Sequence, residues 1–144
     1  MKYLLSLLAG ATIIGMAACS SGTDNSFYKS ADVKPGQIMD SLGAETSTDA
    51  EHKGVFSVVV IADNYVADGV YDVRAHFADF SVDGKFTMPK GLLSYKLKLR
   101  KTNVPTKYQI GFMLPNDTTY YDYLDVVASN GRVESIGYCK TYTF

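Results

Sequence analysis

Strict alternation of apolar and polar side chains is the feature that most constrains the fold of this chain. It is clearest in residues 93–100, where Leu93, Tyr95, Leu97 and Leu99 alternate with Ser94, Lys96, Lys98 and Arg100. A period of two places successive side chains on opposite faces of a β-strand. This stretch therefore predicts a strand with one buried and one solvated face. Period-two patterning begins after Gly54, which indicates an all-β domain over residues 54–144.

Further strands are expected on both sides of residues 93–100. Residues 55–62, VFSVVVIA, form a continuous apolar run rich in β-branched side chains, which is typical of a buried strand. Residues 70–77 and 108–114 alternate again, and a final pair is expected at residues 118–128 and 132–143. Two turn signals separate strands. They are Asp83-Gly84, which favours a two-residue hairpin, and Ser129-Asn130-Gly131.

These patterns predict about eight strands joined by short connections. Parallel strands need crossovers of about a dozen residues, and the chain after Gly54 has no room for them. We therefore expect an antiparallel meander. Such a meander can close into a small barrel or fold over into a β-sandwich, and the barrel is preferred because successive hairpins need no long connection.

In strand count and order, this expected barrel is similar to the calycin architecture of the lipocalins. The resemblance implies a ligand enclosed by the barrel. The chain contains no tryptophan, so the Gly-x-Trp pattern of lipocalins near the first strand is absent. Residues 55–62 are apolar on both faces, and they support the hypothesis of a carrier for a small apolar ligand.

The first nineteen residues, MKYLLSLLAGATIIGMAAC, have the three parts of an export signal. Lys2 supplies the positive end, residues 4–14 form an apolar run, and small residues follow. The run is shorter than the ~20 apolar residues of a membrane-spanning helix. Residues 16–19, Met-Ala-Ala-Cys, resemble the lipobox of bacterial lipoproteins. This resemblance implies cleavage after residue 18 and lipidation of Cys19, and two or more acyl chains anchor a protein stably.

The lipobox divides the chain into a signal peptide (1–18), a lipidated tether with an irregular N-terminal segment (19–53) and the β domain (54–144). Cleavage leaves 126 of the 144 residues, enough for one domain and its tether. Within the tether, residues 35–43 are expected to hold one helical turn. Alternatively, Phe27, Tyr28 and Val33 pack as an irregular flap against the domain. Ser20 follows the cysteine where an inner-membrane retention signal has Asp, which resembles outer-membrane sorting.

Charge and cysteine content exclude some functions. Without Lys2 the chain has thirteen basic and fifteen acidic residues, so nucleic acid is not an expected partner. Lipidation of Cys19 leaves Cys139 without an intramolecular partner. Cys139 is then a buried apolar residue or a free reactive thiol, and burial is preferred because unpaired cysteines are usually buried.

Two groups of side chains are candidates for ligand binding. Residues 85–107 contain seven basic and no acidic residues, among them Lys96, Lys98 and Arg100 on the solvated face of one strand. A strip of one sign attracts anionic glycans, lipid head groups or an acidic protein. The second group comprises Tyr120, Tyr121 and Tyr123, with Tyr138 and Tyr142 on the facing strand. Tyrosine suits both interfaces and sugar stacking.

No catalytic constellation, metal site or cofactor is expected. His52 and His76 lack neighbours at zinc-ligand spacing, and no Gly-x-Ser-x-Gly nucleophile elbow is present. Residues 63–69 resemble a calcium loop in composition, but Tyr65 and Ala67 occupy two ligand positions. The leading hypothesis is a non-enzymatic envelope lipoprotein that binds a ligand or partner through its β domain. The alternatives are the small-ligand carrier and a structural envelope component that associates through its tyrosines.

Overall fold

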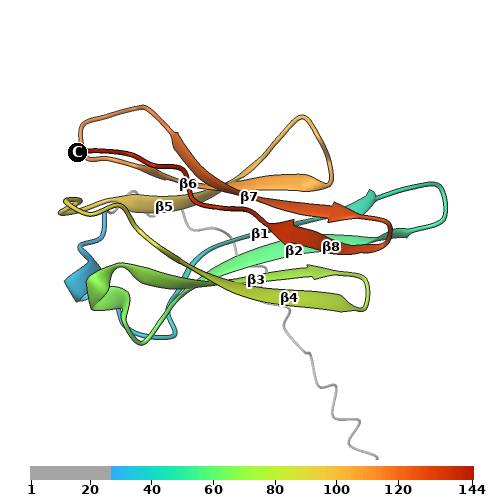
Figure 1. Cartoon of the computed structure of the whole chain (residues 1–144), viewed down its shortest axis with the longest axis horizontal. Coiled ribbons are helices and arrows are strands. Elements are labelled where there is room, and N and C mark those ends of the chain that lie inside the picture. The colour runs from blue at the N-terminus through green and yellow to red at the C-terminus, as the bar shows by residue number, and fades with distance from the viewer. Residues whose placement is uncertain (1–26) are drawn as a thin grey trace, which may run out of the picture.

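The alternating stretches of the sequence form two antiparallel sheets that pack face to face (Figure 1). This computed structural model describes residues 27–144. The first sheet has the order β1 (Ile38–Ser47), β2 (Lys53–Ala62), β3 (Val70–Phe77), β4 (Phe80–Thr87). The second has the order β5 (Lys96–Lys101), β6 (Lys107–Met113), β7 (Tyr121–Ser129), β8 (Arg132–Ile136). Two short 3-10 turns, η1 (Ser30–Asp32) and η2 (Val66–Asp68), complete the elements of this part of the chain.

The all-β antiparallel prediction is confirmed, but the closed calycin-like barrel is wrong. β4 is not hydrogen-bonded to β5, so each sheet ends in two edge strands. β1 lies beside β5, and β4 lies beside β8, because residues 88–95 cross from one edge of the first sheet to the opposite edge of the second. At the β1–β5 edge a side chain replaces the backbone ladder: Asp40 Oδ2 accepts a hydrogen bond of 2.7 Å from the backbone N–H of Leu99.

The core lies between the inward faces of the two sheets. Phe56, Val58 and Val60 of β2 are at most 1% exposed, as are Tyr108 and Ile110 of β6. The Phe56 and Tyr108 rings stack with centroids 4.4 Å apart, and the Tyr108 hydroxyl donates a 3.0 Å hydrogen bond to the Phe56 carbonyl. The interior of the sandwich is thus filled by side chains in contact across it.

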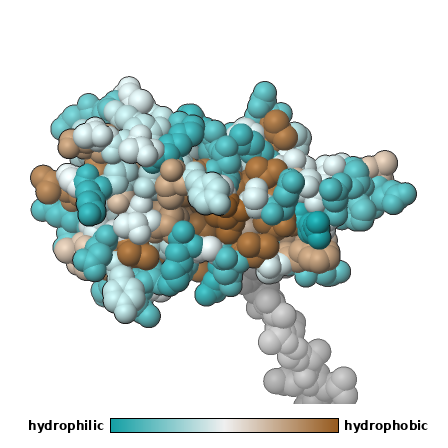
Figure 2. Space-filling view, viewed as in Figure 1, coloured by the Kyte–Doolittle hydropathy of each residue, from teal (hydrophilic) through white to brown (hydrophobic). Residues whose placement is uncertain are grey.

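Apolar side chains at the β4–β8 edge are only partly covered. Val82 of β4 and Ile136 of β8 pack against the core but remain partly exposed. Figure 2 shows apolar side chains gathered in the middle of the face that carries these two strands. This apolar edge is the visible margin of the sandwich interior.

The sheet begins earlier in the chain than the sequence predicted. β1 pairs with β2 from Ile38 to Ser47, where one helical turn and an irregular segment were expected. The helical-turn prediction is wrong because pairing with the strongly β-forming β2 outweighs a weak local preference. The alternative of a packed flap is confirmed for Val33, which is 5% exposed within the core.

The turn predicted at Asp83-Gly84 is also wrong. The chain reverses at Ala78-Asp79, with Ala78 at φ 51°, and Gly84 pairs with Val73 inside β4. Gly84 faces the opposite sheet, where a Cβ on Gly84 would lie 3.0 Å from Ile136 Cδ1 and that side chain would have to shift slightly. The second turn signal is confirmed: Asn130 and Gly131 have φ of 49° and 77° and join β7 to β8.

The last strand is shorter than expected, and this changes the environment of Cys139. β8 ends at Ile136, and residues 137–144 continue as irregular chain along β7. Backbone hydrogen bonds from Gly137 to Asp125 (2.7 Å) and from Lys140 to Tyr123 (2.8 Å) hold this segment. Cys139 is exposed, so the prediction that it is buried is wrong. Partial desolvation nevertheless raises the pKa of its thiol.

Two further findings bear on the predicted membrane anchor. Among residues 27–144, no helix is long and apolar enough to cross a bilayer. The signal peptide, the lipobox and Cys19 lie outside the described residues, and their assignment stays a prediction.

Removal of the Tyr108 hydroxyl should weaken the centre of the sandwich. Tyr108→Phe leaves the ring stack but removes the donor to the Phe56 carbonyl. We expect the free energy of unfolding in a urea titration to fall by about 1 kcal/mol. Tyr65→Phe is the control, because Tyr65 is 67% exposed, and it should change stability by less than about 0.5 kcal/mol. Equal effects of the two variants would contradict the role given to this hydroxyl.

Candidate functional site

A β-bulge between β6 and β7 organises the predicted tyrosine group. Gly111 pairs with Asp122 and Ile110 pairs with Leu124, which leaves Tyr123 as an extra residue in β7. A bulge sends two consecutive side chains to the same face. Tyr123 and Leu124 are accordingly both buried, at 5% and 2% exposure.

Tyr120 lies on the opposite, outward face of the second sheet, across Gly111. Its hydroxyl donates to the backbone carbonyls of Lys98 (3.1 Å) and Gln109 (3.2 Å). The ring fits only because Gly111 has no side chain: a Cβ there would lie 2.4 Å from Cζ of Tyr120. Tyr120 therefore spans from the start of β7 across β6 to β5.

Arg100 covers the ring of Tyr120. Its guanidinium carbon lies 4.3 Å from the ring centroid, a cation–π contact. Desolvation raises the pKa of Tyr120, so its hydroxyl stays protonated and keeps donating to the two carbonyls. With Gly111 beneath the ring and Arg100 against it, the ring is a platform for the guanidinium rather than a surface for stacking sugars.

The three predicted basic residues form a row on the same outward face. Lys96, Lys98 and Arg100 alternate in β5 with the buried Leu97 and Leu99. Lys98 and Arg100 are exposed, and no ion pair joins either of them to a carboxylate among residues 27–144. This differs from the lysines farther along the face. Lys107 pairs with Asp125 at 2.8 Å, and Lys140 pairs with Asp122.

Tyr121 and Tyr123 do not join this surface. Tyr121 stacks on Phe112 with centroids 5.3 Å apart and donates to Asp117 Oδ2 at 2.8 Å. The Tyr123 hydroxyl donates to the Thr87 carbonyl of the opposite sheet at 2.6 Å. Of the expected facing tyrosines, Tyr142 packs on Tyr121 at 5.5 Å, whereas Tyr138 is fully exposed. The structure thus divides the predicted tyrosines: Tyr121, Tyr123 and Tyr142 form an aromatic cluster, Tyr120 lies on the outward sheet face, and Tyr138 is exposed in the C-terminal segment.

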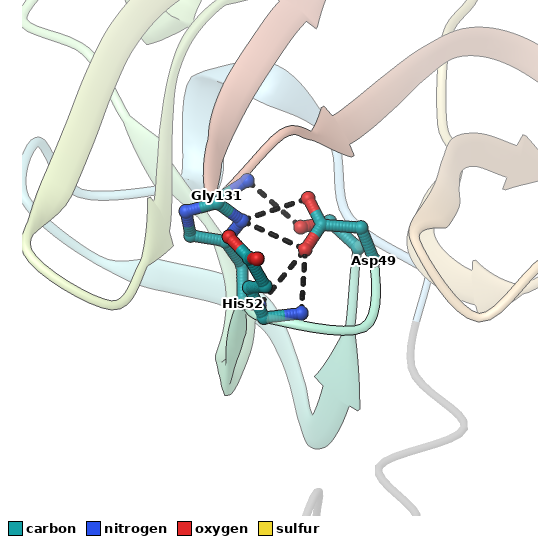
Figure 3. Close-up of polar contacts among 5 residues, drawn as sticks. Asp49, His52 and Gly131 are labelled. Atoms are coloured by element: carbon teal, nitrogen blue, oxygen red, sulfur yellow. Dashed lines mark hydrogen bonds and ion pairs between the residues drawn. The ribbon is translucent and has the colours of Figure 1, made fainter.

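A second polar cluster joins two hairpin tips and was not predicted from the sequence (Figure 3). His52 Nδ1 lies 2.7 and 2.8 Å from the two carboxylate oxygens of Asp49, in the β1–β2 turn. The Gly131 N–H donates to Thr48 Oγ1 at 2.8 Å, which ties the β7–β8 turn to the same place. The Glu51 N–H and the His52 ring lower the pKa of the Asp49 carboxyl.

An Asp–His pair of this kind also orients the base of a catalytic triad. Within residues 27–144, however, no hydroxyl or thiol is hydrogen-bonded to Nε2 of His52. The ring instead packs on Gly131, where a Cβ would lie 2.4 Å from Cδ2 of His52. The arrangement is that of a clasp between two hairpins. The only sequence feature that could have indicated this contact is the Asp-x-x-His spacing of Asp49 and His52.

The loop that resembles a calcium site uses its buried carboxylate for an ion pair. Asp63 is 5% exposed, binds Lys85 and accepts a hydrogen bond from the Tyr65 N–H at 2.9 Å. The hydrogen bond from Lys85 is the main cause that lowers the pKa of Asp63. Over residues 27–144, no group of three or more His, Cys, Asp or Glu side chains is placed to hold a metal ion.

Comparison with known proteins returned no matching family model, no curated protein and no solved structure. The Lys98–Arg100–Tyr120 surface is the candidate site because it unites residues that the sequence singled out and leaves cationic groups facing solvent. We call it the cationic face below.

Substitution of Gly131 tests the hairpin clasp. Gly131→Ala meets a left-handed backbone (φ 77°) and the His52 ring, whereas Gly36→Ala meets a similar φ of 82° with nothing within 4 Å. The left-handed conformation alone costs about 1 to 2 kcal/mol. We expect Gly131→Ala to exceed Gly36→Ala by about 1 kcal/mol or more, because the ring must move.

The double variant His52→Ala/Gly131→Ala separates the two contributions. Removal of the ring should return the cost of Gly131→Ala to about that of Gly36→Ala, as measured by urea unfolding against the His52→Ala parent. If the cost of Gly131→Ala were the same with and without the ring, the clasp would be refuted.

Proposed function

We propose that this chain is a non-enzymatic lipoprotein of the bacterial cell envelope that binds an acidic polysaccharide through the cationic face of its β domain. The anchoring part of the proposal is supported by the lipobox-like residues 16–19 and by the polar spacer after Cys19. Ser20 stands where an inner-membrane retention signal has Asp, which favours sorting to the outer membrane. A rigid sandwich on a lipid tether suits a binding module, because its outward sheet faces need no rearrangement to meet a ligand.

One observation carries the assignment of the binding surface. Arg100 is held over Tyr120 at 4.3 Å beside the exposed Lys98, and neither cation forms an ion pair among the described residues. A guanidinium fixed on a ring loses less freedom when it binds and presents a planar fork to carboxylates and phosphates. The geometry therefore favours anionic groups, with Tyr120 as the support for Arg100.

The spacing along β5 favours a linear polymer over a single small anion. Alternate residues of a strand lie about 7 Å apart on one face, so Lys96, Lys98 and Arg100 form a row of regularly spaced cations. An acidic polysaccharide repeats its charges at comparable intervals, whereas an acidic protein surface has no fixed repeat. The flat, exposed sheet face accommodates an extended chain.

The two alternative functions receive less support. A small-ligand carrier was expected to use a barrel interior, and the two sheets instead pack as a sandwich with the Phe56 and Tyr108 rings stacked between them. A structural component was expected to associate through tyrosines, and of these Tyr121, Tyr123 and Tyr142 contact one another within the domain, whereas Tyr138 is fully exposed.

Lipidation is tested at Cys19. The mature wild-type chain should fractionate with membranes and carry acyl groups on residue 19 by mass spectrometry. Cys19→Ser should release it into the soluble fraction or leave the signal uncleaved, because the thiol is the acyl acceptor. Cys139→Ser is the matched control and should remain membrane-bound. Membrane attachment of a Cys19→Ser chain whose signal peptide has been cleaved would contradict the anchor.

The cationic face is tested at Arg100. We expect Arg100→Gln to weaken binding of alginate, a carboxylated polysaccharide, by about three- to tenfold, or about 0.7 to 1.4 kcal/mol. The measurement is calorimetric titration of the full mature chain in detergent. Lys53→Gln makes the same charge change at the exposed start of β2 and should have little effect.

Neutral dextran and added salt complete this experiment. Dextran should not bind, and alginate binding should weaken as salt rises, because exposed charges are screened. Tyr120→Ala should lower affinity for alginate as well, since Arg100 loses its platform. An alginate affinity that is unchanged in Arg100→Gln, or equally reduced in Lys53→Gln, would overturn the assignment of this face.

A further inference from the structure

One end of the sandwich gathers the segments that are not strands. η1, η2, the connection of residues 88–95 and the C-terminus all lie at the left of Figure 1, opposite most of the hairpin tips. Ser30, Asp68, Lys90 and Tyr95 line a shallow depression of about 200 Å³ there. We call this region the capped end.

The chain enters the described domain at the capped end. Tyr28 and Tyr95 form an antiparallel bridge with backbone hydrogen bonds of 2.7 and 3.0 Å, so the first described residues are fixed beside the start of β5. Cys19 precedes Phe27 by eight residues, which span roughly 28 Å at most when fully extended. An acylated Cys19 would therefore hold this end, rather than the hairpin tips, close to the membrane surface.

The capped end also exposes apolar side chains. Leu93, in the connection before β5, is 85% exposed, and Phe27 beside the bridge is 37% exposed. Phe144 is 48% exposed, and its carbonyl lies near Gly91 of the same connection. Single exposed apolar residues are ordinary. Here they occur next to the point at which the lipidated segment must leave the domain.

Exposed lysines at the capped end lie close to its apolar side chains. Lys29 and Lys34 flank η1, and Lys90 lies in the connection, all of them exposed. The exposed acids of the same elements are Asp32 in η1 and Asp68 in η2. Lysines with nearby apolar side chains are typical of protein segments at membrane interfaces, where each cation near an anionic leaflet contributes about 1 kcal/mol.

We propose that the capped end docks on the bilayer surface, with Leu93 and Phe27 at the head-group boundary and Lys29 and Lys90 near lipid phosphates. This inference rests on the proposed lipidation of Cys19. Docking fixes the orientation of the sandwich, so that β5 runs away from the membrane, beginning at Lys96 and ending at Lys101.

Single tryptophans test this orientation, because the chain contains none. Leu93→Trp places the reporter at the capped end. Val104→Trp is the matched control, since Val104 is 45% exposed in the β5–β6 turn, about 20 Å away along the six residues of β5. Both variants are purified as the lipidated mature chain and reconstituted in phosphatidylcholine–phosphatidylglycerol vesicles that contain brominated lipid.

We expect the fluorescence of Leu93→Trp to shift to the blue and to lose about half of its intensity, as for a side chain at the head-group boundary. Val104→Trp should keep an exposed emission maximum and show little quenching. Addition of Lys29→Gln/Lys90→Gln to Leu93→Trp should reduce the quenching, whereas addition of Lys53→Gln/Lys101→Gln should not.

Failure of the docking and failure of the anchor give different results. A lipidated chain in which position 93 is unquenched, or in which positions 93 and 104 are quenched equally, would overturn the docking alone. Absence of acyl groups on residue 19 by mass spectrometry would overturn the anchor and the docking together.

Discussion

The face-to-face contact of the two sheets at Phe56 and Tyr108 is the interaction on which the rest of the structure depends. Each sheet is apolar on one face, and neither face can stay in water, so the two must cover each other. The ring stack and the Tyr108–Phe56 hydrogen bond fix how they meet. Once the inner faces are matched, every alternate side chain of β5 points outward, and the row of cations follows from the packing of Leu97 and Leu99.

The sandwich has edges that a barrel would not have, and individual side chains cover them. Asp40 accepts a hydrogen bond from the Leu99 N–H at the β1–β5 edge. The antiparallel bridge between Tyr28 and Tyr95 fixes the backbone just before β5. An exposed edge strand can pair with another chain. These contacts occupy the edge and hold β5 in place. The cationic face benefits directly, because Arg100 and Lys98 lie on the strand that Asp40 and Tyr28 hold. Tyr120 then secures the outer side of the same strand through the Lys98 carbonyl.

Local patterns predicted the strands well where burial alternates and failed where distant contacts decide. Residues 70–77 match β3 at both ends, and Asn130-Gly131 is a turn as expected. Asp83-Gly84 has the local chemistry of a turn, but pairing with Arg74 and Val73 of β3 keeps both residues inside β4. β1 became a strand through pairing with β2, and the choice of sandwich over barrel depends on the path of residues 88–95. The candidate site divides similarly: period two placed Lys96, Lys98 and Arg100 on one face, whereas the Arg100–Tyr120 contact depends on Gly111 and the bulge, which no spacing rule revealed.

The two proposals place different functions on different parts of one strand. If the capped end rests on the bilayer, Lys96 lies nearest the membrane and Arg100 lies farther out, toward the hairpin tips. The cationic face then runs roughly parallel to the membrane normal. It does not rest on the bilayer, so lipid phosphates do not occupy it. A polysaccharide that runs along β5 would meet Arg100 first and Lys96 last. In this orientation Tyr120 holds the Arg100 guanidinium over the sheet, where no ion pair among the described residues engages it.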